Sequence, residues 1–421
     1  MTKSQPSASA NAPLSWRHNL IAIWFAELVA IVGFSVVLPL LPLYVPRLGV
    51  QDEREVKLWS GLIYTAHAVT MAIFGPIWGA ISDRRGRKVM VERAMFSGAI
   101  VIGLMGLART VQQLAILRML QGALTGTVTA ATALVATNTP RERAGYALGL
   151  LQMAVYVGSS VGPLLGGLVA DTLGYQAAFW VTGALLFLAG MGVLFFVREE
   201  FHPVAPSREP QGGAGVGGAT SRARLWNRLA PALGSAVLGI LGVRLVMKLG
   251  SNLLSPVLPL FIQSIVPADA RVASITGLVS GGSAAAGAVG ALGLGWLGDR
   301  VGYRWILLAC AAISVVCYVP QAFAGSPAAL LLWQAGTGLA MGGILASVSA
   351  WLARLAPEGQ EGIIYGMDAT FASVANAVGP LMGSALAVWL GLRAPFLFAA
   401  GVFGIAGVAA VRLLPGRRPS K

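Results

Sequence analysis

The sequence has few charged residues, few cysteines and few histidines, and each shortage excludes a class of protein. Only 11% of its 421 residues are charged, whereas a soluble globular domain has roughly 25%. Cys310 and Cys317 are its two cysteines and lie in one apolar stretch, so we expect packed free thiols rather than a disulfide or a metal site. The sequence has no Walker loop, no histidine–cysteine cluster and no catalytic constellation, so we expect no ATP hydrolysis, no metal, no cofactor and no enzyme activity.

Long apolar runs dominate what is present. Hydrophobic residues make up 56% of the chain, in runs of about 20 residues that are long enough to span ~30 Å of hydrocarbon. Backbone groups in lipid must be satisfied within each segment, so these runs are helices. We therefore expect an all-α polytopic membrane protein with twelve transmembrane helices, at 19–46, 58–81, 89–108, 112–137, 145–170, 176–197, 229–262, 272–297, 305–324, 327–354, 363–390 and 394–412.

The chain repeats itself at half its length. The stretch 79–86 returns as 295–302, and the stretch 162–166 returns as 379–383. Parallel repeats of apolar helices bracket a central path across a bilayer. We expect two six-helix bundles related by a pseudo-twofold axis. The expected parts are an N-terminal tail at 1–18, bundles at 19–198 and 228–412, a Gly/Pro-rich linker at 199–227, and a C-terminal tail at 413–421.

The net charge of +14 does not predict nucleic-acid binding, because the basic residues gather in alternate loops. They concentrate at 84–93, at 198–228 and at 412–421, while the segment 51–55 is net acidic. This is the positive-inside pattern. It places both termini and the linker in the cytoplasm of a cell membrane. The segment 1–15 is polar and lacks an apolar core, so we expect no cleaved signal peptide.

Two motifs carry a family resemblance. The loop between the second and third helices reads Gly79-x-x-x-Asp83-Arg84-x-Gly86-Arg87, and Asp299 and Arg300 belong to its partial copy. The fifth helix carries a glycine motif at Gly149, Gly158, Gly162, Pro163, Gly166 and Gly167. Together they resemble the drug:proton antiporter branch of the major facilitator superfamily, over essentially the whole chain.

The resemblance implies roles for both motifs. Asp83 would lie near the start of the eleventh helix, where the helix dipole favours a carboxylate. Arg84 and Arg87 would pair with Glu142 or Glu361, in a latch that breaks when the halves rock. The alternative is that this basic loop only anchors the topology. The glycines of the fifth helix would pack tightly against the eighth, where the small residues are Gly281, Gly282, Gly287 and Gly290.

Five charges lie inside predicted membrane helices, where each is costly unless it is paired or hydrated. They are Glu27, Arg118, Arg244, Lys248 and Asp368. Glu27 and Arg244 occupy equivalent positions of the repeat, so they line the same cavity. We expect Glu27 to carry the coupling proton, because burial favours the neutral form of a carboxylate and a nearby cation favours the charged form. The alternatives are a fixed Glu27–Arg244 salt bridge and a position wetted at the helix end.

The other charges have open roles. Asp368 is either a second proton carrier or part of the latch. The resemblance implies a proton-transfer role for Arg118, and the alternative is a structural hydrogen-bond hub. Arg244, Lys248 and Asn252 form one polar stripe on the seventh helix. The five charges sum to +1, which favours anionic or zwitterionic substrates.

Aromatic, small polar and amide side chains at helical spacing define candidate cavity walls. Such a pocket suits amphipathic substrates, and the alternative for each residue is packing. Besides the polar stripe, the candidates are Tyr64, His67, Gln121, Gln152, Tyr156, Phe371 and Asn376.

The pattern as a whole predicts a secondary transporter that exports small amphipathic compounds in exchange for protons, as a monomer in the inner membrane of a bacterium. Its partners would be a small-molecule substrate, protons and the lipid bilayer. The alternatives are a proton-coupled importer of a metabolite, and a sensor or lipid-binding protein that transports nothing.

Overall fold

The protein is helical throughout the part that the structure describes. This computed structural model describes residues 16–140, 143–199, 235–355 and 361–413. Short segments continue the first helix through η1 (Leu38–Leu40), α2 (Leu41–Tyr44) and η2 (Val45–Leu48). The main helices are α1 (Trp16–Val37), α3 (Glu53–Arg85), α4 (Arg87–Met105), α5 (Val111–Leu124), α6 (Thr127–Asn138), α7 (Ala144–Leu173), α8 (Tyr175–Phe196), α10 (Ser235–Asn252), α11 (Val257–Ile265), α12 (Val272–Val301), α13 (Tyr303–Ala322), α14 (Pro327–Leu355), α15 (Glu361–Leu390) and α16 (Ala394–Leu413).

Most of these helices are long and apolar enough to cross a membrane. Eleven spans meet that description among the described residues. The remaining helix of the predicted twelve is α4, whose first two turns carry Arg87, Lys88, Glu92 and Arg93. An all-α, multi-pass membrane fold is therefore confirmed.

Two of the predicted continuous spans are broken, which corrects the prediction. The span at 112–137 consists of α5 and α6, which are separated at Gly126, where φ is +138°. The span at 229–262 begins outside the described residues and then divides into α10 and α11, with Pro256 as the N-cap of α11. Glycine reaches positive φ without steric cost and proline lacks a backbone N–H, so each permits the interruption.

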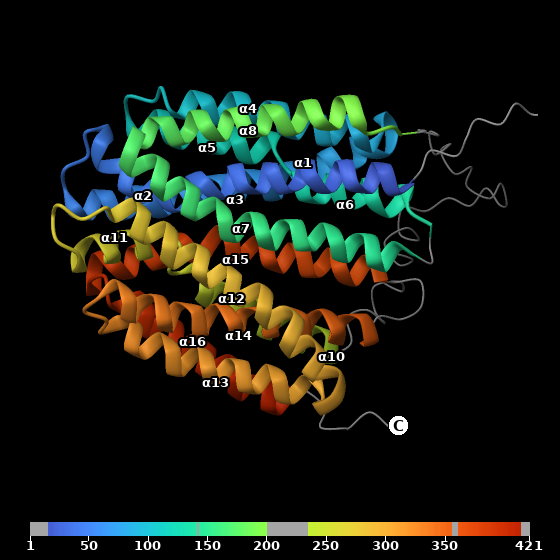
Figure 1. Cartoon of the computed structure of the whole chain (residues 1–421). Helices are drawn as coiled ribbons and strands as arrows, with labels where there is room; N and C mark the ends of the chain where they lie inside the picture. The colour runs from blue at the N-terminus through green and yellow to red at the C-terminus, as the bar shows by residue number, and fades with distance from the viewer. Residues whose placement is uncertain (1–15, 141–142, 200–234, 356–360, 414–421) are drawn as a thin grey trace, which may run out of the picture.

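Each half of the chain has its own buried core. One cluster of buried side chains belongs mainly to α1–α8 and the other to α10–α16. Figure 1 shows the two groups of helices side by side, from blue to green and from yellow to red. Cys310 and Cys317 are buried free thiols, and they pack against Gly343 and Gly336 of α14. The prediction of packed free thiols is confirmed.

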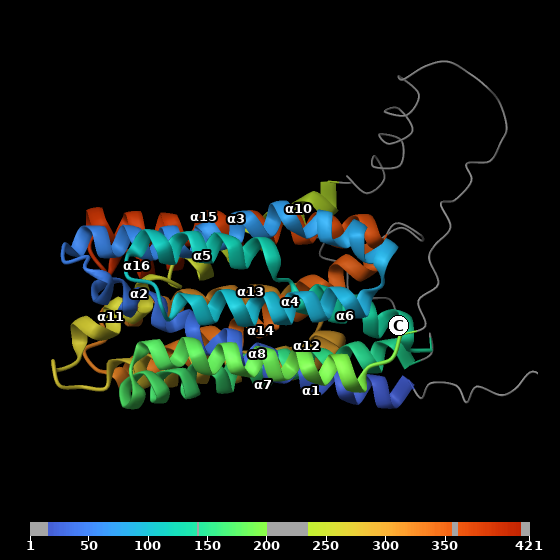
Figure 2. The same ribbon diagram turned by 90° about the horizontal axis from the view of Figure 1, so that it is seen from above.

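The halves meet along two helix pairs, α7 with α12 and α3 with α15. Figure 1 shows the first pair side by side, and Figure 2 shows the second. Their close contacts lie toward the end that carries α2 and α11. The Thr65 hydroxyl donates to the Ala377 carbonyl at 2.7 Å, and the Ser274 amide donates to Asp171 at 2.7 Å. Farther along α3, every residue from 71 to 77 is exposed, on all sides of the helix. The halves are thus joined at the α2/α11 end, and the opposite part of α3 is uncovered.

Candidate functional site

Glu27 is an acid buried in the middle of the N-terminal half. It lies on α1 with 0% exposure, and it forms no ion pair with any described residue. The polar neighbour that interacts with it is Thr127, the first residue of α6. Complete burial makes the alternative of a wetted helix end wrong. A charged carboxylate in such surroundings is costly unless it is paired or hydrated.

Arg244 pairs with a different acid. Its Nη1 lies 2.6 Å from Oδ2 of Asp368 on α15, so the alternative of a fixed Glu27–Arg244 bridge is wrong. The pair ties α10 to α15 inside the C-terminal half. Two turns along α10, Asn252 donates to the Asn376 side-chain oxygen at 2.8 Å, which makes a second polar link between the same helices.

Lys248 lies one turn from Arg244 on α10, close enough for the two cations to repel each other. Its ammonium forms no ion pair with any described residue. Asp368 is mostly buried and already paired with Arg244, so among the described residues the charge of Lys248 is left uncompensated.

Arg118 lies at the centre of a second polar cluster, between α3 and α5. It is 2% exposed and donates to the Gln121 side-chain oxygen at 2.6 Å. Its guanidinium carbon lies 5.9 Å from the Tyr64 ring centroid, and His67 lies beside it. The structure therefore brings together four residues that the sequence nominated on two different helices. No acid in the described part of the chain pairs with this buried cation.

A pocket of about 620 Å³ opens among α7, α10, α12 and α14. Tyr156, Arg244 and Lys248 of the predicted cavity residues line it, and Gln334 lines it from α14. Gln152 lies nearby in sequence on α7 and is exposed. The other nominated residues do not belong to this lining, namely Tyr64, His67, Gln121, Asn252, Phe371 and Asn376.

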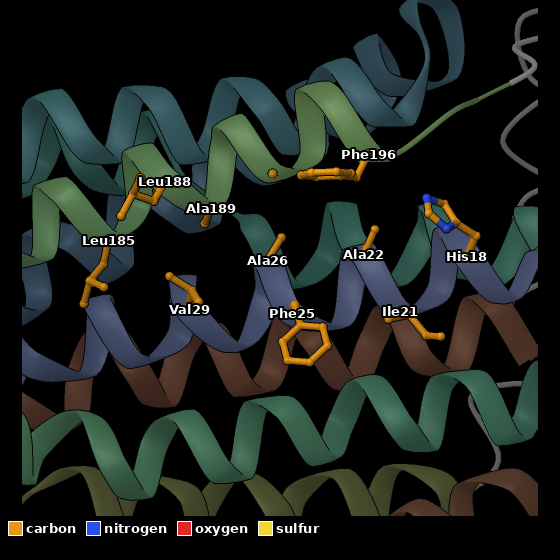
Figure 3. Close-up of a pocket in the computed structure, with 11 residues that line it drawn as sticks. His18, Ile21, Ala22, Phe25, Ala26, Val29, Leu185, Leu188, Ala189 and Phe196 are labelled. Atoms are coloured by element: carbon orange, nitrogen blue, oxygen red, sulfur yellow. The ribbon is translucent and has the colours of Figure 1, made fainter.

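A second hollow, of about 480 Å³, lies between α1 and α8. Figure 3 shows its lining side chains, among them Val29, Leu185 and Phe196. Of its eleven lining residues only His18 is polar or charged. Ile21 and Phe25 in this lining are exposed. An apolar groove of this kind fits lipid chains, and it offers little to recognise a polar substrate.

The glycine motif of α7 faces two neighbours. A Cβ added at Gly158, Gly162 or Gly166 would meet α1, whereas one added at Gly167 would meet the Ala273 backbone of α12. Gly149 has nothing near it. The motif thus packs α7 mainly against α1. Its proline contributes to the inter-half contact, because Gly277 of α12 lies against the Pro163 carbonyl.

The glycines of α12 also divide between two helices, where the resemblance implied a single partner. Gly281 faces α7 at Ser160. The other three, Gly282, Gly287 and Gly290, face α14. Expecting all four to meet the fifth helix was wrong, because successive glycines of a helix point to different sides.

The loop motif forms the turn between α3 and α4. Gly86 adopts φ +96° there, which favours glycine, and Gly79 has open space around it. Arg84 is exposed. The side chains of Asp83 and Glu361, and all of Glu142, lie outside the described residues, so the latch pairs stay a prediction. In the partial copy, Asp299 accepts from the Tyr303 hydroxyl, and Arg300 stacks 3.8 Å from the Trp296 ring centroid.

Sequence reasoning missed two capping arrangements. The Glu199 carboxylate, beyond α8, accepts from the backbone amides of Arg87 and Lys88 at 3.0 and 2.8 Å. It satisfies free amides at the start of α4 and complements the helix dipole. An acid so distant along the chain gives no local signal for this.

The second arrangement holds the break between α5 and α6. Arg93 donates to the Leu124 carbonyl at 2.6 Å, and Trp78 donates to the Ala123 carbonyl at 2.6 Å. The Arg93 guanidinium also stacks 3.6 Å from the Trp78 ring centroid. These contacts satisfy carbonyls at the end of α5, where the helix would otherwise leave them unpaired.

Comparisons with known proteins agree with this architecture. The chain is 35% identical over 394 residues to the multidrug resistance protein MdtG of Enterobacter lignolyticus (strain SCF1), covering 94% of this chain and 91% of that protein. It is also 35% identical to the MdtG protein of Salmonella arizonae over 393 residues, covering 93% and 94%. A solved structure of a bacterial homolog of the human lysosomal transporter Spinster, inward-facing and unoccupied, matches with a TM-score of 0.73 at 16% identity, covering 96% of this chain and 99% of that one. The Major Facilitator Superfamily matches at residues 23–247 and 240–421. The chain therefore belongs to the Major Facilitator Superfamily.

Proposed function

We propose that this protein is a proton-coupled exporter of small amphipathic compounds, working by alternating access in the inner membrane of a bacterium. The similarity to proteins named for multidrug resistance supports the export of drug-like compounds. The protein works as a monomer with both termini in the cytoplasm, and the proton gradient drives it without a cofactor. No chemical conversion of the substrate takes place.

The observation that carries proton coupling is the burial of Glu27 without a charged partner. A fully buried acid that forms no ion pair with a described residue is stable when neutral and costly when charged. Loss of its proton therefore requires water or a cation to approach it, which a rocking motion of the two halves provides. Buried ionisable groups of this kind mark proton pathways in transporters.

The inter-half contacts support a state that is open toward the cytoplasm. The halves touch at the α2/α11 end through Thr65 and Asp171, and the opposite part of α3 is exposed all round. With both termini cytoplasmic, the uncovered end faces the cytoplasm, where an exporter collects its substrate. Outward opening then requires the α7–α12 and α3–α15 contacts to separate.

The test is transport into proteoliposomes under an imposed pH gradient, with a panel of chemically unrelated amphipathic compounds. An antiporter accumulates substrate in vesicles that are acidic inside, because protons leaving the vesicle drive substrate in. Accumulation of several unrelated compounds under that gradient supports the proposal. Accumulation of a single metabolite under the opposite gradient would show a symporter and overturn it.

A further inference from the structure

The charged residues that line the pocket among α7, α10, α12 and α14 are all basic. Its lining includes two cations, Arg244 and Lys248, and contains no acidic residue. Five serines and one threonine add hydroxyl groups, and Tyr156, Met247 and Met341 add apolar and aromatic surface. The volume of about 620 Å³ falls within the range of pockets that hold small organic ligands.

One of the two cations is already neutralised. Asp368 lies 2.6 Å from the Arg244 guanidinium and compensates its charge, although Asp368 does not itself line the pocket. Lys248 has no such partner among the described residues. An ammonium held among membrane helices without a counter-ion is energetically costly, so a residue of this kind is explained by an anion that binds there.

We propose that this pocket binds the acidic group of an amphipathic organic acid, with the Lys248 ammonium as its counter-ion. The hydroxyls of Ser159, Ser255 and Ser280 donate hydrogen bonds to the acid, whereas the other three serine and threonine hydroxyls of the lining already donate to backbone carbonyls. The methionine and tyrosine side chains contact the apolar part of the acid. This inference rests on the proposed transport function and names a substrate class for it. The site lies mainly in the C-terminal half, and α7 of the N-terminal half contributes Tyr156 to its lining. Bound substrate therefore contacts a helix that packs against the other half.

Binding of a matched acid and amide tests the charge directly. The probes are 1-naphthaleneacetate and its uncharged amide, measured by equilibrium dialysis against the full chain in nanodiscs of phosphatidylcholine, whose headgroups carry no net charge. We expect the wild-type protein to bind the acid at least tenfold more tightly than the amide. Lys248→Gln should weaken binding of the acid about tenfold and leave the amide unchanged. The matched control is Lys57→Gln, near the start of α3 and outside the pocket lining, which should alter neither.

A second variant keeps the test decisive if Lys248→Gln folds poorly. Lys248→Cys is treated either with a methanethiosulfonate that forms an aminoethyl disulfide and restores the cation, or with one that forms a methyl disulfide and is neutral; methanesulfinate leaves in both reactions. The Lys248→Cys variant should regain its preference for the acid over the amide only after treatment with the cationic reagent. Equal binding of acid and amide by the wild-type protein, or an unchanged preference in both variants, would overturn the proposal. These measurements involve no pH gradient, so they are independent of whether transport is coupled to protons.

Discussion

Arg244 and Asp368 hold α10 and α15 together through an ion pair with 2.6 Å between Nη1 and Oδ2. Both side chains are mostly buried, with 18% and 11% of their surface exposed. A buried pair of this kind is expensive to break from one side only, because the remaining charge has no counter-ion.

The first prediction follows from the cost of removing only one partner of this buried ion pair. Arg244→Gln alone and Asp368→Asn alone should each destabilise the folded protein, by roughly 3 kcal/mol. The double variant should be less destabilised than the Asp368→Asn variant, because neither member of the pair is then left charged without its partner. Thermal unfolding of all three variants in the same detergent measures this. Strictly additive losses would show that the two side chains do not interact.

The second prediction contrasts two glycines of one motif. Gly167→Ala places a methyl group against the Ala273 backbone of α12, whereas Gly149→Ala meets nothing. Because backbone cannot yield as a side chain does, Gly167→Ala should cost about 1–3 kcal/mol and loosen the α7–α12 contact. Gly149→Ala should leave stability unchanged.

Cysteine cross-linking between positions 171 and 274 reports this contact, since Asp171 accepts from the Ser274 amide. Cross-linking efficiency should fall in the Gly167→Ala background and stay at the wild-type level in the Gly149→Ala background. Equal efficiency in both backgrounds would mean that the close approach at Gly167 is unimportant.

The third prediction concerns the break between α5 and α6. Arg93→Lys keeps the charge but loses the planar stacking on Trp78 and the geometry of the bond to Leu124. It should therefore destabilise the protein by about 1–2 kcal/mol. Arg84→Lys is the control, since Arg84 is exposed at the end of α3. A thermal shift of the same size in both variants would contradict the capping role of Arg93.

The multi-pass helical fold was predictable because hydrophobic run length and the internal repeat report directly on membrane spans. The Arg118 cluster was predictable in part, since Tyr64 and His67 share one face of a helix. The ion pair between Arg244 and Asp368 was not predictable from the sequence. The repeat places Arg244 opposite Glu27, but Asp368 lies on a helix whose approach to α10 depends on tertiary packing. The two helix breaks could have been predicted from Gly126 and Pro256, because glycine and proline often interrupt helices.

Contacts between distant segments were the hardest to foresee. Glu199 reaches the start of α4 only because the fold brings the end of α8 beside it. The glycines of α7 divide between α1 and α12 according to helix rotation, and a sequence motif does not specify this. In both cases the local sequence pattern predicts that a helix forms, whereas the tertiary packing determines which residues or helices that helix contacts.

The central claim is that Glu27 couples transport to protons, and replacing it with glutamine tests this most directly. Glutamine keeps the shape of the protonated acid but has no proton to release. In proteoliposomes, Glu27→Gln should still exchange labelled for unlabelled substrate without a gradient, and it should lose stimulation by an acidic interior. Glu53→Gln, at the exposed start of α3, should behave as the wild-type protein does. Stimulation of the Glu27→Gln variant to the wild-type level would contradict the account.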